Sequence, residues 1–160
     1  MLNLHLPNQT KQTILSQTSI KMNTNKILLA GLIGGVVAFF LGFLFYGVIC
    51  SEFFASNMGS ATGVMRGDDE MQWIPMIVGH IAYGLLFAII YGRWASISTF
   101  ATGAKAGAVI GLLVALAHGM IQLGSTHLST MMGTLADVGV ATLLSAGTGG
   151  VVGWFLGRGQ

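Results

Sequence analysis

Four long stretches of this chain contain no Lys, Arg, Asp or Glu, and each is long enough to cross a lipid bilayer. They are Ile27–Ser51, Met71–Gly92, Ala106–Ala136 and Val138–Gly157. A membrane-spanning helix needs roughly 20 mostly apolar residues. Only 8% of the residues are charged, against about 25% in an ordinary soluble domain, which is too few to cover a soluble surface. The sequence therefore predicts an all-α fold, a four-helix transmembrane bundle in a lipid bilayer.

The predicted helices form a single domain over residues 26–160. We expect them at about 27–51, 73–93, 103–124 and 135–157. Aromatic residues that favour the membrane interface lie at or near the helix ends, at Trp73, Trp94 and Trp154. Pro75 suits the first turn of the second helix, where its missing N–H costs little. The longest connection, about 52–72, begins with a segment that could extend the first helix by a turn or two.

Residues 1–25 are polar and lack a sustained apolar period, so they predict a flexible tail. Met22 stands just before the first apolar run, and either Met1 or Met22 could be the true start. A cleaved signal peptide is the alternative for that run, but its apolar core should span only about 7–15 residues. Ile49 before Cys50 is also too bulky for lipoprotein processing. We therefore expect a retained helix.

The basic residues predict the orientation of the bundle. With four crossings, six of them fall on one side, namely Lys11, Lys21, Lys26, Arg93, Lys105 and Arg158. The opposite side holds only Arg66 among the basic residues. Because Lys and Arg accumulate in cytoplasmic loops, both termini are predicted to be cytoplasmic.

Small residues recur at intervals of four on every predicted helix. They are Gly31 and Gly35; Gly84, Ala88 and Gly92; Gly103, Gly107 and Gly111; and Gly149, Gly153 and Gly157. Between helices in lipid, small residues allow the close backbone approach on which association depends. We interpret these stripes as tight packing within one bundle; an additional face for a homo-oligomer or for other membrane proteins is the alternative.

Four polar residues of the second and third helices are candidates for a ligand-binding pocket. Antiparallel helices would place His80 and His118 at similar depth in the outer half, with Tyr83 and Gln122 on their faces. The helical period predicts that His118 and Gln122 point into the bundle. Two such histidines could ligate haem or a metal ion, or they could be neutral and hydrogen-bonded to their neighbours. Without a second carboxylate ligand or a haem-attachment motif, we predict neither a metal nor a cofactor.

Asp137 is the acidic residue nearest to a predicted span. Thr134 and Asp137 fit a capping box at the start of the fourth helix, with Thr134 as N-cap and Asp137 at the third helical position. This structural role is the first interpretation. An intramembrane carboxylate that binds a ligand or couples to protons is the alternative.

Several classes of protein lose support from composition and spacing. The formal net charge of +2 leaves no basic surface for nucleic acid. Cys50 is the only cysteine, which excludes the cysteine pairs of disulfide-generating enzymes. Small multidrug exporters need a carboxylate within a span, and the first helix has none. Ser145 lies deeper than either histidine, which disfavours a serine–histidine dyad.

From Met22 onward the chain resembles a family of small four-helix bacterial integral membrane proteins classified as a domain of unknown function. The resemblance rests on Gly42–Gly47, on the aliphatic run around Asp137 and on the closing Gly149–Gly157. Phe45–Tyr46 matches the aromatic-Tyr pair that such proteins commonly have at the end of the first helix. The resemblance implies the fold and a location in the bacterial cytoplasmic (inner) membrane, and no reaction.

Three functions remain open from the sequence. We expect first a non-enzymatic structural or accessory membrane protein that acts through helix contacts. The second is a small transporter or ligand-binding bundle that uses His80, Tyr83, His118, Gln122 and Asp137 around an outward-facing pocket. The third is a bis-histidine redox subunit.

Overall fold

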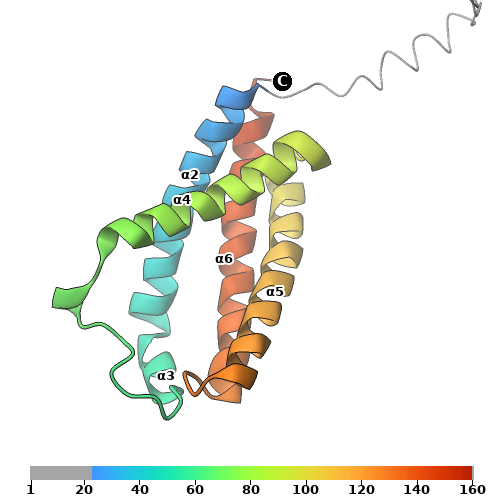
Figure 1. Cartoon of the computed structure of the whole chain (residues 1–160). Coiled ribbons are helices and arrows are strands. Elements are labelled where there is room, and N and C mark those ends of the chain that lie inside the picture. The colour runs from blue at the N-terminus through green and yellow to red at the C-terminus, as the bar shows by residue number, and fades with distance from the viewer. Residues whose placement is uncertain (1–22, 160) are drawn as a thin grey trace, which may run out of the picture.

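A computed structural model describes residues 23–159 of the chain, so residues 1–22 of the predicted tail and the choice of start lie outside it. The described elements are almost entirely helical (Figure 1). In chain order they are α2 (Thr24–Gly42), the π-helix η1 (Phe43–Ile49), α3 (Ser51–Ser56), the 3-10 turn η2 (Asp68–Glu70), α4 (Trp73–Ile89), the π-helix η3 (Ile90–Ala95), α5 (Phe100–Ser125) and α6 (Met131–Gly157).

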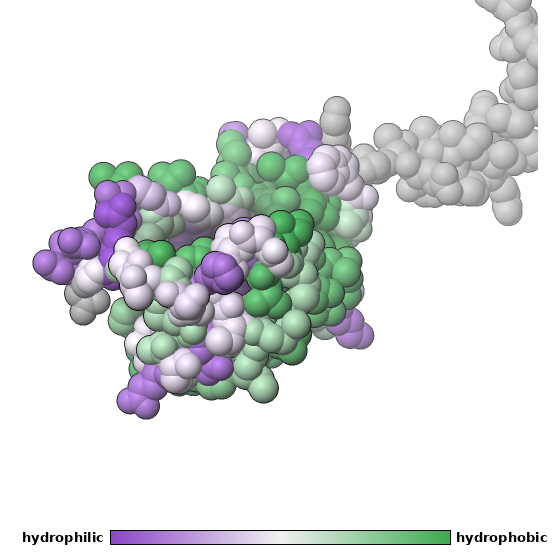
Figure 2. Space-filling model, turned by 60° about the horizontal axis from the view of Figure 1, so that its bottom comes forward, coloured by the Kyte–Doolittle hydropathy of each residue, from purple (hydrophilic) through white to green (hydrophobic). Residues whose placement is uncertain are grey.

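Four continuous helical segments are long and apolar enough to cross a membrane. They are Thr24–Ile49, Trp73–Ala95, Phe100–Ser125 and Met131–Gly157. The four predicted spans are therefore confirmed as helices, with ends displaced by a few residues. Figure 2 shows apolar residues over the flanks of the molecule and polar residues gathered at the end that carries the loops.

α5 and α6 form a hairpin in which backbone lies directly against backbone. A methyl group added to Gly107 would overlap the carbonyl oxygen of Ser145 and lie 3.3 Å from the Cα of Gly149. Gly103 meets Gly149 and Gly153 in the same way. Such contacts are possible only where both helices carry small residues, because larger side chains would hold the axes apart.

α4 crosses α2 obliquely instead of running alongside it (Figure 1). The crossing is built on Gly31 and Gly35 of α2 and Gly84 of α4; a methyl group on Gly35 would lie 2.6 Å from the Cα of Ile81. α2 also packs on α6, where Gly34 faces Val152. On the other side of the crossing the first half of α4 diverges from the bundle, and residues 72–79 are all exposed.

The largest buried side chains lie toward the end of the bundle where α2 begins and α6 ends. Tyr91, Phe87, Leu156 and Val152 are fully buried there, together with Ile27. We call this end the terminal end. The loop end is opposite and consists of α3, the 57–72 loop and the α5–α6 connection. At the loop end Gly59 N–H donates to the carbonyl of Leu128 over 3.0 Å, which ties the two loops together.

At two helix ends the local structure, and not only the end residue, differs from the prediction. The first helix breaks at Cys50, whose φ is −112°, and the segment after it forms the separate helix α3. The predicted capping box is wrong: α6 begins at Met131, and its N-cap is Thr130, whose hydroxyl accepts from Gly133 N–H at 3.1 Å. Thr130 is the N-cap instead of Thr134 because Asn57, from the other loop, accepts a hydrogen bond from the backbone N–H of Thr130 over 3.0 Å. Asp137 consequently lies in the second turn of α6 and needs another explanation.

Candidate functional site

Four polar side chains of α6 lie on one face of this helix. Thr134, Asp137, Ser145 and Thr148 share this face because their spacing follows the helical period. Thr134, Ser145 and Thr148 are buried, and Asp137 is half-buried. Tyr46 and Tyr83, from the α2–α4 pair, both bond to residues on this face.

Asp137 is held by the hydroxyl of Tyr46. Tyr46 Oη donates to Asp137 Oδ1 over 2.7 Å, and the tyrosine ring lies 5.3 Å from that of Phe54 in α3. Tyr46 belongs to η1, a stretch of π-helix that continues α2. The wider π-turn changes the direction in which a side chain leaves the helix, and such turns are frequent at functional sites. The pair joins residues that are 91 positions apart in the sequence.

Tyr83 makes the second polar link, from α4 to α6. Its hydroxyl lies 2.6 Å from Ser145 Oγ, and Ser145 donates its own proton to the carbonyl of Ala141. A serine hydroxyl has one proton to give, so Tyr83 is the donor to Ser145. Among the described residues, no histidine is hydrogen-bonded to Ser145, which is held by Tyr83 and by the backbone of its own helix.

Tyr91 makes the third link. It lies in η3, is fully buried, and donates to the carbonyl of Gly103 in α5 over 2.7 Å. Tyr46, Tyr83 and Tyr91 are the three tyrosines of the chain. Each of them forms a hydrogen bond from the α2–α4 side of the bundle to the α5–α6 hairpin. Along α4 the rings of Tyr83, Phe87 and Tyr91 follow one another at centroid distances of 5.1 and 5.8 Å.

His80 lies where α4 leaves α2. Its Nδ1 is 2.7 Å from the carbonyl of Met76, so Nδ1 carries the proton in the neutral ring and Nε2 presents a lone pair. A methyl group on Gly42 would lie 3.1 Å from Nε2, which places that atom against α2. The ring meets Phe39 edge-on, with centroids 5.3 Å apart. His80 is thus packed at a helix crossing rather than isolated in lipid.

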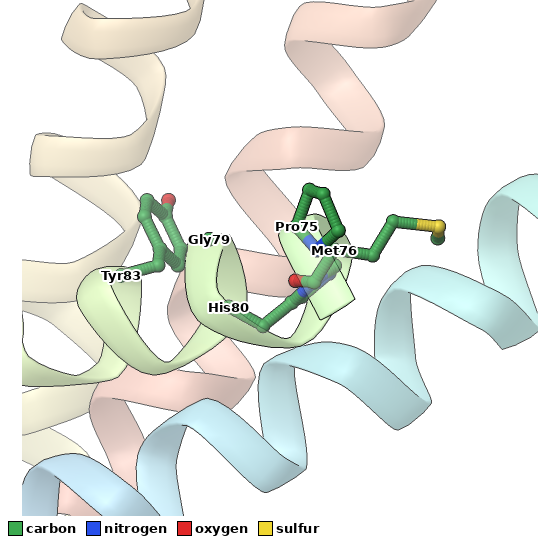
Figure 3. A pocket seen from close by; sticks show the side chains of 5 residues that line it. All are labelled: Pro75, Met76, Gly79, His80 and Tyr83. Atoms are coloured by element: carbon green, nitrogen blue, oxygen red, sulfur yellow. The ribbon is translucent and has the colours of Figure 1, made fainter. Parts of the chain in front are cut away.

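An open recess of about 310 Å³ lies along the diverging half of α4. All of its lining residues come from this helix: Pro75, Met76, Gly79, His80 and Tyr83 (Figure 3). Two of the predicted site residues, His80 and Tyr83, therefore share one recess. It is open along its length, so it is a surface groove and not an enclosed chamber.

The other two candidates of the predicted pocket are placed differently. His118 is exposed on α5, so the prediction that it points into the bundle is wrong; Gln122 is half-buried. The reason is that α4 packs mainly on α2 while α5 packs mainly on α6, so the helices with the two histidines are not close neighbours. In the described part of the chain no three His, Cys, Asp or Glu residues gather in a way that could hold a metal ion.

In the described part of the chain, the arrangement pairs each tyrosine hydroxyl with an acceptor on the α5–α6 hairpin. The partners Tyr46 and Ser145 are site residues that the sequence did not predict. A signal for Ser145 existed, because it shares a helical face with Asp137. No signal existed for the π-turn at Tyr46.

Comparison of the chain with protein-family models, with curated proteins and with solved structures found no match.

Proposed function

We propose that this chain is a non-enzymatic membrane protein, a structural or accessory component that acts through helix contacts with other membrane proteins. The observation that carries the proposal is the set of hydrogen bonds that the three tyrosines form within the spans. Tyr46 bonds to Asp137, Tyr83 to Ser145, and Tyr91 to a backbone carbonyl. These bonds fasten two helix pairs to each other along the length of the bundle, instead of converging on one chamber.

The first half of α4 supports the same proposal from outside the bundle. Every residue from 72 to 79 is exposed, and Ile74 has 76% of its surface accessible. The neighbouring Ile77 and Val78 are apolar and exposed as well. Apolar side chains gain little by leaving lipid tails, so this half-helix is free to exchange lipid for a partner helix without unfolding the bundle.

We place both termini in the cytoplasm and the protein in a bacterial cytoplasmic membrane. The distribution of charge supports this orientation. Lys26, Arg93 and Arg158 all lie at the terminal end, whereas Arg66 lies in the loop beyond α3 together with acidic residues. Reporter fusions test it: an enzyme active only outside the cytoplasm should work when fused into the 59–70 loop. Activity of a cytoplasmic reporter there would reverse the orientation.

Photo-crosslinking combined with native mass spectrometry tests the proposed function. A photoreactive residue replaces Ile74 on α4 or, as a matched control, Leu113, which is similarly apolar and 60% exposed on α5. We expect a crosslinked second polypeptide of one defined mass from position 74, and none from position 113. An uncrosslinked chain from both positions would overturn the accessory role. If the chain without a partner instead carried a stoichiometric haem, metal or small molecule, a function that binds this ligand would replace the accessory role.

A ligand-binding or transport function is the second candidate, and one observation favours it. Thr148 Oγ1 is buried on the polar face of α6 and has no hydrogen-bond partner among the described residues. An unpaired buried hydroxyl costs free energy unless water or a ligand satisfies it. Asp137 and the lone pair of His80 Nε2 are further acceptors on the α2 side. For this candidate, the small molecule seen by native mass spectrometry should be lost in the Asp137→Asn variant and kept in Glu52→Gln.

A further inference from the structure

The recess on the diverging half of α4 is open at its middle. Pro75, Gly79 and Tyr83 follow one another at intervals of one turn and lie on one side of the helix (Figure 3). A methyl group added to Gly79 would meet nothing within 4 Å, so the space between the two rings is free. The helical period places the exposed Ile74 about half a turn around the helix from Tyr83. The recess is therefore separate from the side of α4 where we propose that a partner helix docks.

His80 contributes an unused lone pair to the recess. Its Nδ1 lies 2.7 Å from the carbonyl of Met76 and spends the proton of the neutral ring there, so Nε2 can only accept. No hydrogen bond to Nε2 is formed in the part of the chain that the structure describes. In the same part, Thr148 Oγ1 is the one buried side-chain nitrogen or oxygen atom without a partner. Nε2 is therefore not sealed inside the protein, and a donor from outside can reach it.

Packing fixes the direction of this lone pair. The imidazole ring meets Phe39 edge-on, with centroids 5.3 Å apart. A methyl group on Gly42 would lie only 3.1 Å from Nε2, so glycine at this position leaves room for the nitrogen. Together with the bond to the carbonyl of Met76, these contacts hold the ring in one orientation. An acceptor that is already ordered loses little conformational freedom when a donor binds to it, which favours binding.

The side-chain donors of the recess are all engaged within the protein. Tyr83 donates its proton to Ser145, and His80 donates from Nδ1 to the carbonyl of Met76. The other lining side chains have no donor. The recess thus offers two acceptors, His80 Nε2 and Tyr83 Oη, and it carries no side chain of fixed charge. A complementary ligand is neutral and supplies the donor.

We infer that the recess binds a neutral, lipid-soluble molecule whose ring hydroxyl donates a hydrogen bond to His80 Nε2. His80 lies seven residues beyond Trp73, about 10 Å along the helix axis from this interfacial residue. An unpaired acceptor in such apolar surroundings costs free energy, which a hydroxyl donor would recover. The volume of about 310 Å³ is at the lower end for small-molecule sites and suits a single ring, and the open side lets an alkyl chain continue into lipid. The inference does not rest on the accessory role, which concerns the other side of α4.

A pair of probes that differ only in the donor tests the inference. The purified full chain in a neutral detergent receives para-nonylphenol or its methyl ether, and native mass spectrometry measures the bound fraction. We expect the phenol to bind about tenfold more tightly than the ether, the equivalent of about 1.4 kcal/mol and within the usual range for one hydrogen bond. His80→Phe should abolish this preference, whereas His80→Gln should keep part of it because the glutamine amide oxygen can accept. Partition into the micelle cancels, since both probes are compared between variants.

Two further variants separate the recess from general effects on the bundle. Gly79→Leu should fill the recess and lose the phenol while the chain still folds, because position 79 has no neighbour to displace. His118→Phe removes the exposed histidine of α5 and should bind like the unaltered chain. The inference fails if the unaltered chain binds phenol and ether equally, if His80→Phe or Gly79→Leu keeps the preference, or if His118→Phe loses it. Such a failure leaves the accessory role standing, because crosslinking from position 74 tests that role separately.

Discussion

The two helix pairs of this molecule differ in how far their close contact extends. α5 and α6 touch along most of their length, with Gly103 and Gly107 of one against Gly149 and Gly153 of the other. α2 and α4 touch at one crossing around Gly84, and beyond it α4 diverges (Figure 1). Gly79, only five residues before Gly84, has nothing within 4 Å of an added methyl group. Close packing in this bundle therefore extends only as far as both helices present small residues.

The α5–α6 contact should be the most sensitive part of the molecule to added volume. We expect Gly107→Val to destabilise the protein by about 3 kcal/mol, at the upper end of the usual cost of overpacking a tight core. The reason is that its side chain would displace the backbone at Ser145 and Gly149. Unfolding by a denaturing detergent, followed by circular dichroism, measures the loss.

Gly139→Val is the matched control for this change. Gly139 lies in the same hairpin, on α6, and an added methyl group there meets nothing within 4 Å. Its stability should remain within about 0.5 kcal/mol of the unaltered protein, as for surface substitutions in general. Equal losses for the two variants would show that the close contact at Gly107 is not what makes the hairpin sensitive to added volume.

The α2–α4 crossing should be the next most sensitive. Gly84→Val would drive its side chain into the backbone of Gly31 and Gly35, and we expect a loss of about 2 kcal/mol. Because α4 has few other contacts, its detachment should leave the α5–α6 hairpin helical. A cysteine in place of the fully buried Ala88, in a Cys50→Ser background, would report detachment through faster maleimide labelling.

Gly79→Val tests whether position along α4 or close contact decides this outcome. It places the same side chain on the same helix, in the half that diverges, and should change neither stability nor labelling. If Gly79→Val accelerated labelling as much as Gly84→Val, the diverging half would hold α4 in place and the comparison would be reversed.

The sequence predicts the spans well because burial in lipid leaves a strong local signal. A run without charges marks each helix, and Trp73–Ala95 begins at the predicted residue. The capping of α6 could not be predicted in the same way. Thr130 and Thr134 are both suitable N-caps, and the choice depends on Asn57, a residue 73 positions away. Local sequence gives no information about a partner at that distance.

The candidate site was predicted only in part, for the same reason. The sequence identifies His80, Tyr83 and Asp137 as unusual polar residues in apolar surroundings. The prediction of a pocket, however, assumes that all four helices are near-parallel neighbours, which would bring His118 close to His80. The oblique course of α4 breaks that assumption. The Tyr46–Asp137 bond was hidden because it depends on a π-turn and on residues that are far apart in the chain.

The hydrogen bonds that join the two helix pairs should have smaller effects than the glycine contacts. We expect the Tyr46–Asp137 bond to contribute about 1.5 kcal/mol, near the maximum for interhelical bonds in membranes. A double-mutant cycle of Tyr46→Phe and Asp137→Ala measures it. Each single variant should lose most of this energy, and the double variant little more, because either change alone already removes the bond. Additive losses would mean that the two residues stabilise the bundle independently of each other.

The Tyr83–Ser145 bond should have the smallest effect, because its loss leaves the bond of Ser145 inside α6 in place. Ser145 keeps its donation to the carbonyl of Ala141 when Tyr83 is removed, so Tyr83→Phe leaves no buried donor without a partner. We expect a loss of about 0.6 kcal/mol, the average for such bonds, with Ser145→Ala giving a similar value. This bond lies at the crossing, because Tyr83 stands between Ile81 and Gly84 of α4. A loss well above 1.5 kcal/mol for Tyr83→Phe would therefore mean that one hydroxyl, and not the glycines, decides how far α4 follows the bundle.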